Sequence, residues 1–324
     1  MGTILSGMRP TGRLHLGHLL GVLNNWKELQ DEYQCYFMVA DWHALTSEYE
    51  DSSALRENVR QMVIDWLSAG IDPEKAIIFR QSDVYQHAVL HLMLSMITPL
   101  PWLERCPTYK EQMQEIKGKD LSTYGFLGYP LLQAADILLY KADTVPVGED
   151  QLPHLELTRE IARRFNYLYG AVFPEPRALL TASSKVAGLD GRKMSKSYGN
   201  CIFLSDDAKT IRERIRSAVT DPQKIYKDSP GRPESCNVFA YENIFLSESC
   251  SEIEAQCREG KLGCVKCKGY LADAIIEYLH PIHESRKHYE KEPDIVDRLL
   301  ADGAEKASVT AASNLSLAMK AMGL

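Results

Sequence analysis

The chain has 324 residues, of which 45% are hydrophobic and 25% charged, and its formal net charge at pH 7 is −7. This composition is typical of globular proteins and argues against a disordered or fibrous chain. No run of 18 apolar residues occurs and the N-terminus lacks a charged-then-apolar leader, so we expect a cytoplasmic protein without a membrane partner. The length suits one large domain and a smaller one.

The first element predicted from the sequence is a short strand at residues 4–5, followed by a turn at residues 10–12. The run His-Leu-Gly-His at 15–18 comes next, at the start of a segment with helical spacing of apolar residues. A helix N-terminus presents free N–H groups and a positive dipole end, so it attracts phosphate. Gly17 would let a flat base or sugar lie against the backbone. The segment indicates a nucleotide site, although two histidines can also simply cap a surface helix.

Strands and helices alternate along the following part of the chain. Apolar runs at 35–40, 76–79 and 144–147 predict buried strands, and helical spacing predicts helices at 54–69 and 84–97. This alternation indicates an α/β fold with a parallel sheet. Ligands of parallel sheets bind at the carboxyl ends of strands. Residues 41–45 follow one such strand, and residues 148–151 follow another and open a helix.

Residues 129–140 predict a strongly apolar helix, preceded by a charged helix that begins at residue 109 and ends near 117–119. Gln133 and Asp136 lie three residues apart and therefore share one face of the apolar helix. A buried carboxylate is costly unless it is paired, so Asp136 needs a donor. That donor is either a ligand, a local cap or an arginine.

Late in the chain, Lys-Met-Ser-Lys-Ser at 193–197 lies in a predicted loop and contains two lysines three residues apart. These lysines could contact a pyrophosphate along its length, or they could be ordinary solvated surface residues. From about residue 205 the pattern is helical to the end, with breaks at 221–222 and 230–233. Residues 185–232 contain eleven basic and six acidic residues, which leaves −12 on the rest of the chain. Such a basic segment can steer a polyanion or form a solvated face.

Neither of the common nucleotide-binding motifs, GxGxxG and GxxxxGK[ST], occurs in the sequence. The sequence therefore does not support an ordinary dinucleotide-binding or P-loop site.

The pairing of His-Leu-Gly-His with a late Lys-Met-Ser-Lys-Ser resembles the two signature motifs of class I aminoacyl-tRNA synthetases. Over essentially its whole length the chain is similar to bacterial-type tryptophanyl-tRNA synthetases, a resemblance that also rests on residues 129–140, 145–151 and 303–307. It implies a Rossmann-like catalytic domain formed by residues 1–200 and about 290–324. It further implies an all-helical anticodon-binding domain at about 201–289, and a homodimer.

The activity implied is activation of L-tryptophan by ATP and its transfer to tRNA(Trp). The implied catalytic residues are His15, His18, Lys193 and Lys196, with Mg²⁺ assisting the departure of pyrophosphate. Further residues implied at ATP are Arg9, Pro10, Thr11, Gly17, Asp150, Gln151, Met194 and Ser195. A lysine that helps bind ATP in many relatives would fall near Gln112, where Lys110, Lys117 and Lys119 are the alternatives.

On the amino-acid side, the resemblance implies that Asp136 accepts the indole N–H. Tyr129, Gln133 and Gln151 would hold the amino group and carboxylate. The residues expected to wall the ring are Leu5, His43, Ile137, Val145 and Val147. Many family members have methionine at the Gln133 position, and Tyr-x3-Gln-x2-Asp is a tyrosyl-type arrangement, so a tyrosine–tRNA ligase is the alternative. From other classes, a small-molecule adenylyltransferase or a metal-bearing nucleic-acid module without catalysis would compete.

Five of the eight cysteines fall between residues 236 and 267. Cys236, Cys257, Cys264 and Cys267 are separated by 20, 6 and 2 residues, which is compact enough to close around one metal centre. The spacing resembles that of a minority of tryptophanyl-tRNA synthetases that hold a [4Fe–4S] cluster, and four thiolates suit structural zinc equally well. Cys250 is a rival ligand. The remaining cysteines, predicted to be ordinary thiols, are Cys35, Cys106 and Cys201. We expect the centre to be structural and to hold nearby cations where an anticodon could meet them, namely Arg258, Lys261, Lys266 and Lys268.

Overall fold

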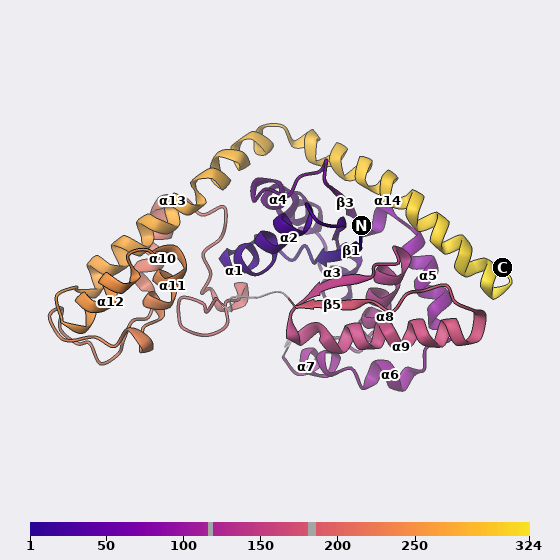
Figure 1. The fold of residues 1–324 in the computed structure, drawn as a ribbon, viewed down its shortest axis with the longest axis horizontal. Helices are drawn as coiled ribbons and strands as arrows, with labels where there is room; N and C mark the ends of the chain where they lie inside the picture. The colour runs from indigo at the N-terminus through magenta and orange to yellow at the C-terminus, as the bar shows by residue number, and fades with distance from the viewer. Residues whose placement is uncertain (116–118, 181–185) are drawn as a thin grey trace. The chain divides into compact units, whose positions relative to one another are not determined.

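The computed structural model describes residues 1–115, 119–180 and 186–324, which form two compact units (Figure 1). Unit 1 consists of Met1–Gly12, Asn25–Ala182 and Glu292–Leu324, and unit 2 consists of Arg13–Asn24 and Ser183–Lys291. The C-terminal segment thus returns to unit 1 after the chain has passed through unit 2. The assignment of a catalytic and an anticodon-binding role to separate parts of the chain stays a prediction.

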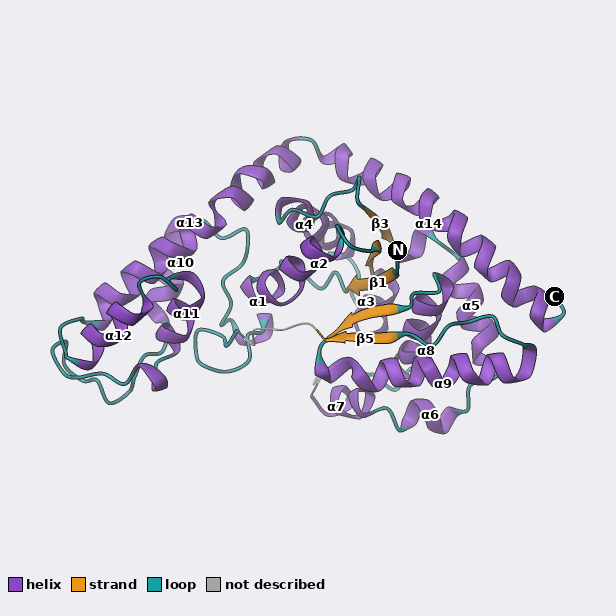
Figure 2. Ribbon diagram, in the orientation of Figure 1, coloured by secondary structure: helices purple, strands orange, loops and turns teal. Residues whose placement is uncertain are grey.

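Unit 1 contains a parallel sheet, drawn in orange in Figure 2, which has five strands within the described residues. Its strands are β1 (Thr3–Met8), β2 (Gln34–Val39), β3 (Ala76–Arg80), β4 (Thr144–Val147) and β5 (Arg177–Leu180). Their spatial order is β3-β2-β1-β4-β5, and every neighbouring pair is parallel. The chain therefore reverses its direction of winding between β1 and β4, and in such sheets ligands bind outside the carboxyl ends of the strands at that point.

The predicted α/β fold with a parallel sheet is confirmed, and four of its strands coincide with the predicted apolar runs. The edge strand β5 was not predicted. It has four residues, none of them fully buried, and prolines at 174 and 176 precede it, so neither hydrophobicity nor periodicity distinguishes it from a loop.

Helices connect and cover these strands. In unit 1 they are α2 (Asn24–Leu29, whose first residue belongs to unit 2), α3 (Asp41–Glu48), α4 (Leu55–Ser68), α5 (Gln86–Ser95), α6 (Leu100–Glu104), α7 (Pro107–Glu115), α8 (Tyr124–Leu139), α9 (Leu152–Tyr169) and α14 (Pro293–Met322), with short 3₁₀ turns η2 (Gln81–Asp83) and η3 (Glu149–Gln151). Helices α4 and α5 confirm the predictions at 54–69 and 84–97 to within two residues.

Helix α8 begins five residues earlier than the predicted start at 129. The Thr123 hydroxyl accepts a hydrogen bond from the Phe126 N–H at 3.2 Å and so caps the helix. Pro130 then lies inside the helix. The predicted end of the preceding helix near 117–119 falls partly outside the described residues.

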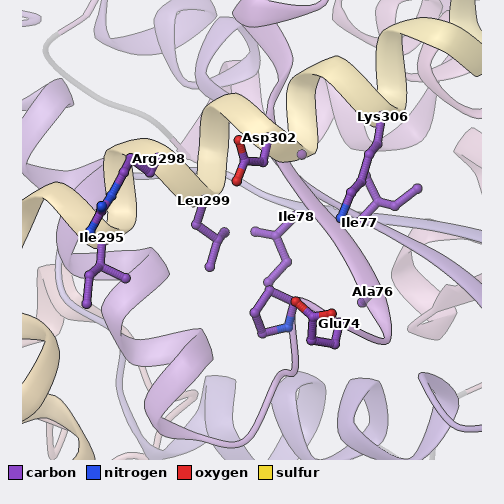
Figure 3. Close-up of a pocket in the computed structure, with 11 residues that line it drawn as sticks. Glu74, Ala76, Ile77, Ile78, Ile295, Arg298, Leu299, Asp302 and Lys306 are labelled. Carbon is purple, nitrogen blue, oxygen red and sulfur yellow. The ribbon is translucent and has the colours of Figure 1, made fainter.

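The core of unit 1 is formed by inward-facing residues of the strands together with α5, α8, α9 and α14. Helix α14, yellow in Figure 1, packs against β3, α4, α5 and α8. A cavity of about 370 Å³ remains between α14 and the β3 edge, and Figure 3 shows it. It is lined among others by Ile77, Ile295, Arg298, Asp302 and Lys306, and includes none of the predicted site residues.

Close contact between α14 and β3 depends on Gly303. A Cβ atom at this position would lie 1.8 Å from the carbonyl oxygen of Ile78, which is backbone and cannot swing aside. Only glycine therefore lets the helix approach the strand this closely.

Replacing Gly303 with alanine is expected to lower the free energy of unfolding by about 3 kcal/mol, because the helix must move away from the strand. The matched control is Gly125→Ala in α8, where a Cβ would meet nothing within 4 Å. Its effect is expected to stay within about 1 kcal/mol, on the stabilising side. Urea denaturation followed by circular dichroism measures both variants, and equal midpoints for the two would contradict this account of Gly303.

In unit 2 the elements are α1 (Leu16–His18), the π-helical turn η1 (Leu19–Leu23), η4 (Lys196–Tyr198), α10 (Ala208–Ser217), η5 (Pro233–Ser235), α11 (Asn237–Phe245), α12 (Cys250–Arg258) and α13 (Cys264–Lys291). Helices α10 and α11 pack on α13, where Ile211, Leu271 and Ile275 are fully buried. Within the described part of the chain, no helix is long and apolar enough to cross a membrane.

Candidate active site

The His-Leu-Gly-His run begins helix α1 in unit 2. His15 is the N-cap residue, and its Nδ1 atom accepts a hydrogen bond from the Gly17 N–H at 3.1 Å. The Nδ1 atom of His18 in turn accepts from the His15 N–H at 3.2 Å. The two side chains thus form a reciprocal cap of the kind that usually requires a hydroxyl and a carboxylate. The prediction that both histidines lie at a helix N-terminus is confirmed.

These hydrogen bonds determine where each ring carries its proton. Burial, together with the charge of Lys196, lowers the pKa of His15 to about 4. Burial also lowers the pKa of His18 well below its ordinary value, with His15 and Lys196 adding to the effect. Both rings are therefore neutral near pH 7, and since each Nδ1 is an acceptor, each Nε2 carries the proton. The pair offers two N–H donors to an anion, with ring centroids 3.8 Å apart.

The Lys-Met-Ser-Lys-Ser loop is held in shape by Asn200, which is buried. The Asn200 Oδ1 atom accepts from the Ser195 N–H at 2.8 Å, and its Nδ2 atom donates to the Lys193 carbonyl at 3.1 Å. Nδ2 also donates to Asp190 at 2.7 Å. One amide side chain therefore ties Asp190, Lys193 and Ser195 together.

Unit 2 brings the two motifs side by side. The Leu16 N–H donates to the Ile202 carbonyl at 3.0 Å and the Leu204 N–H donates to the Leu14 carbonyl at 3.0 Å, so the segments pair in antiparallel fashion. A Cβ on Gly17 would lie 3.0 Å from the His15 ring and 3.4 Å from the sulfur of Met194. Lys196 is close enough to both histidines for its charge to lower their pKa values, whereas Lys193 is exposed.

In unit 1, the predicted residues that follow strands lie at the sheet's point of reversal. Arg9, Pro10 and Thr11 come directly after β1, and Asp150 and Gln151 come directly after β4. The Arg9 Nη2 atom donates to the Ser47 hydroxyl at 2.5 Å, and burial lowers the pKa of its guanidinium.

Asp136 is buried on α8 and receives three donors. Its carboxylate accepts from His43 Nε2 at 2.8 Å, from His87 Nδ1 at 2.7 Å and from Gln81 Nε2 at 2.8 and 3.0 Å. Burial alone would raise the pKa of Asp136, but the hydrogen bonds from the two histidines outweigh it and hold the pKa well below its usual range. The group is therefore an ionised carboxylate.

The alternative that a local cap or an arginine pairs Asp136 is wrong, because its protein donors are His43 of α3, Gln81 of η2 and His87 of α5. A carboxylate has about four acceptor positions, and the four contacts from these donors occupy them, so a ligand N–H would take the place of one of the two contacts from Gln81. The His87 Nε2 atom lies 2.9 Å from the Tyr140 hydroxyl, which extends the network further.

Four of the residues expected to wall the indole ring belong to the core of unit 1. Leu5, Ile137, Val145 and Val147 are buried in the core of unit 1, and Gln133 is half-buried on α8. His43 is buried and binds Asp136, so it has a polar role in addition to the predicted packing one.

Tyr129 and Gln151 are joined by a histidine that was not predicted. His154 contacts the Tyr129 hydroxyl through Nε2 at 3.2 Å and the Gln151 Oε1 through Nδ1 at 3.0 Å. Gln81, His87 and His154 are thus the site residues that the sequence did not reveal. The useful signal was that a buried Asp136 must have donors, but nothing in the spacing identified which residues supply them.

Of the three lysines considered for ATP, Lys110 is exposed on α7. Lys119 forms an ion pair with Glu48 at 2.5 Å. Lys117 lies outside the described residues. The choice among them stays a prediction.

The four predicted cysteine ligands lie near one another in unit 2, at the N-cap of α11, the last turn of α12 and the first turn of α13. Burial raises the pKa of the Cys257 thiol, and Cys236 and Cys264 raise it further. The Cys267 thiol donates to Glu242 Oε1 at 2.9 Å. As they stand, however, no three His, Cys, Asp or Glu side chains among the described residues are arranged to hold a metal ion.

The other cysteines and the cations named with them are also placed. The Cys250 thiol donates to Asn243 at 3.0 Å, and Cys35, Cys106 and Cys201 are buried. Arg258 pairs with Glu234 and Glu254, and Lys261 pairs with Glu259. Lys266 lies 5.5 Å from the ring of Tyr270, and Lys268 donates to the Arg216 carbonyl. Exposed pairs of this kind are weak and can exchange for a polyanion.

A model of the family described as class I tRNA synthetases (W and Y) matches residues 2–280. A tryptophan–tRNA ligase of Thermotoga maritima is 52% identical over 99% of both chains, and one of Aquifex aeolicus is 44% identical over 99% of both. A structure of tryptophanyl-tRNA synthetase from Campylobacter jejuni with ADP and tryptophan superimposes with a TM-score of 0.92 at 34% identity, covering 99% of this chain and 100% of that one. The chain therefore belongs to the class I tRNA synthetases of the tryptophan and tyrosine type.

Proposed function

We propose that the protein is a tryptophan–tRNA ligase that activates tryptophan with ATP and then transfers it to tRNA(Trp). The observation that supports the class I chemistry most strongly is the pairing of residues 14–16 with 202–204, which brings the two motifs together in one unit. The full-length relatives described above are named for tryptophan, so the tyrosine and adenylyltransferase alternatives lose their support. Exchange of pyrophosphate into ATP, compared between tryptophan and tyrosine, is the experiment that tests the assignment.

In the first step, the tryptophan carboxylate attacks the α-phosphorus of ATP and pyrophosphate leaves. The Nε2–H groups of His15 and His18 donate to phosphate oxygens, and Gly17 leaves space for the adenosine. Lys193 and Lys196 neutralise the charge that develops on pyrophosphate. Positioning and charge neutralisation supply most of the acceleration in such a step.

The other residues assigned to ATP would hold it in position. Arg9, Pro10 and Thr11 follow β1, Asp150 and Gln151 follow β4, and Met194 and Ser195 belong to the lysine loop. Mg²⁺ supplies further charge neutralisation when bound. It commonly binds through substrate phosphates and water rather than through a protein cage.

On the tryptophan side, Asp136 accepts the indole N–H in place of one of the two contacts from Gln81. Tyr129, Gln133 and Gln151 hold the amino group and carboxylate, and the apolar side chains around Asp136 enclose the ring. A site whose buried acceptor is left unpaired by the wrong substrate rejects that substrate strongly. The network of two histidines and Gln81 supports this role, because it keeps Asp136 ionised and fixed.

We further propose that Cys236, Cys257, Cys264 and Cys267 hold a [4Fe–4S] cluster, with zinc as the alternative. The thiols come from three helix ends within one unit, and four thiolates suit either centre. The centre would be structural, within an anticodon-binding domain at about residues 201–289.

Anaerobically purified protein is expected to be brown and to contain about four irons per chain, the number in a cluster ligated by four cysteines. Cys264→Ser should lose the iron, whereas the control Cys250→Ser should keep it, because the Cys250 thiol binds Asn243 instead. Iron and zinc analysis of the purified variants decides. One zinc per chain would show that the site holds zinc and not the cluster. Metal-free protein that still charges tRNA would contradict a structural metal site of either kind.

The protein is also proposed to act as a homodimer in the cytoplasm. Large apolar side chains gather on one stretch of unit 1 and are more than half exposed, as expected of a surface that a second copy covers. They are Tyr85, Leu92, Met96 and Leu100. The mass in solution, compared with the 36.6 kDa of one chain, tests the dimer.

A further inference from the structure

His154 is a buried histidine placed between two residues assigned to tryptophan. It lies in the first turn of α9, has 2% of its surface exposed, and meets the Tyr129 ring edge-on with centroids 5.4 Å apart. One ring nitrogen contacts the Tyr129 hydroxyl and the other contacts Gln151. None of the steps assigned above uses it.

The hydrogen bonds around His154 settle its tautomer. Gln151 Nε2 donates to Asp150 Oδ2 at 3.0 Å, so Gln151 Oε1 is the amide atom that faces His154. An oxygen acceptor opposite Nδ1 requires that Nδ1 carry a proton. Burial lowers the pKa of His154 to about 4, so the ring is neutral and holds only that one proton. The Nε2 atom is then an acceptor, and the Tyr129 hydroxyl must donate to it.

This arrangement leaves two oxygen atoms with lone pairs to offer. The Tyr129 oxygen has used its proton on His154 and also shares a hydrogen bond with Thr108, which leaves one acceptor position. The Gln151 Oε1 atom accepts from His154 and has a second lone pair. Without His154, the Tyr129 hydroxyl could rotate and present its O–H to a cation, and the Gln151 amide would be oriented by Asp150 alone.

We propose that His154 is a positioning residue that turns the Tyr129 hydroxyl and the Gln151 carbonyl into a pair of acceptors for the α-ammonium group of tryptophan. This inference rests on the proposed function, in which Tyr129 and Gln151 bind the amino-acid backbone. It adds the residue that makes both groups hydrogen-bond acceptors. It also predicts that losing His154 weakens binding of the ammonium group and not of the carboxylate.

The test measures inhibition constants of two tryptophan fragments against pyrophosphate exchange. Tryptamine has the ammonium but no carboxylate, and indole-3-propionate has the carboxylate but no ammonium. His154→Leu is expected to weaken tryptamine and tryptophan roughly 10-fold, the scale of a lost hydrogen bond to a charged group, and to leave indole-3-propionate within about twofold. His154→Gln, which keeps one donor and one acceptor, should restore most of the loss.

Equal weakening of all three ligands by His154→Leu, with no rescue by glutamine, would show a merely structural role and overturn the inference. Should the leucine variant not fold, His154→Asn makes the same comparison, because its shorter amide can replace Nδ1 but not reach Tyr129. Tyr129→Phe separates this inference from the function it rests on. If Tyr129→Phe leaves tryptamine binding unchanged, the proposed contact of Tyr129 is wrong; if it weakens tryptamine while the His154 variants do not, only the role of His154 is wrong.

Discussion

Replacing Lys196 with alanine is expected to lower the rate constant of tryptophan activation by roughly 10²–10³-fold, the usual cost of losing one group that stabilises transition-state charge. Lys196 is half-buried in η4 and lies near both His15 and His18, whose pKa values its charge lowers. Its own charge is needed most when pyrophosphate departs. An interaction made in the transition state affects the rate constant, whereas substrate binding is left nearly intact.

Pre-steady-state measurement of adenylate formation, together with equilibrium binding of tryptophan, separates the two quantities. Lys193→Ala should likewise lower the rate constant and leave tryptophan binding nearly intact, although Lys193 is more exposed. Lys209→Ala on α10 is the matched control, since this lysine has no assigned role, and its rate should match the parent protein. A variant of Lys196 that loses tryptophan affinity but keeps its rate constant would remove this lysine from the chemical step.

Replacing Asp136 with asparagine is expected to raise the Kd of tryptophan roughly 10- to 100-fold, because buried donors lose their acceptor. The carboxylate receives hydrogen bonds from His43, His87 and Gln81, and an asparagine would turn an N–H₂ group toward at least one of these donors. The indole N–H would lose its acceptor in the same step. Urea denaturation should show that the variant is also less stable than the parent protein.

An analogue without the N–H group distinguishes recognition from general damage to the site. Benzothienylalanine has sulfur in place of the indole nitrogen, so the parent protein should bind it poorly and Asp136→Asn should weaken it little further. Asp31→Asn, which removes an exposed carboxylate paired with Lys75, is the control and should leave both ligands unaffected. If Asp136→Asn weakened tryptophan and the analogue by the same factor, Asp136 would not be the acceptor of the indole N–H.

The elements that could be predicted from the sequence are those with strong local signals. Strands β1 to β4 are apolar runs, and α4 and α5 show helical spacing over ten or more residues. The two class-wide motifs identified the segments that pair in unit 2, because their residue types at those places suit phosphate. Strand β5 has no comparable signal, since it is short, at the edge of the sheet and partly exposed.

The polar network of unit 1 could not be predicted, because its members are far apart in the sequence and ordinary in their local setting. His43, Gln81 and His87 come from three elements and meet only at Asp136. Sequence periodicity describes which face of a helix is buried, but it does not show which neighbour supplies a donor. His154 is hidden for the same reason, since in the sequence it is one polar residue near the start of an amphipathic helix.

Exchange of labelled pyrophosphate into ATP, measured with each amino acid in turn, tests the proposed activity most directly. Exchange needs only the activation step, so it does not depend on tRNA or on any metal centre in unit 2. We predict that tryptophan supports exchange and that tyrosine supports it far more weakly, because the full-length relatives that this chain matches are named for tryptophan. Equal or faster exchange with tyrosine would contradict the tryptophan assignment while leaving the class I chemistry in place, and no exchange with any amino acid would contradict both.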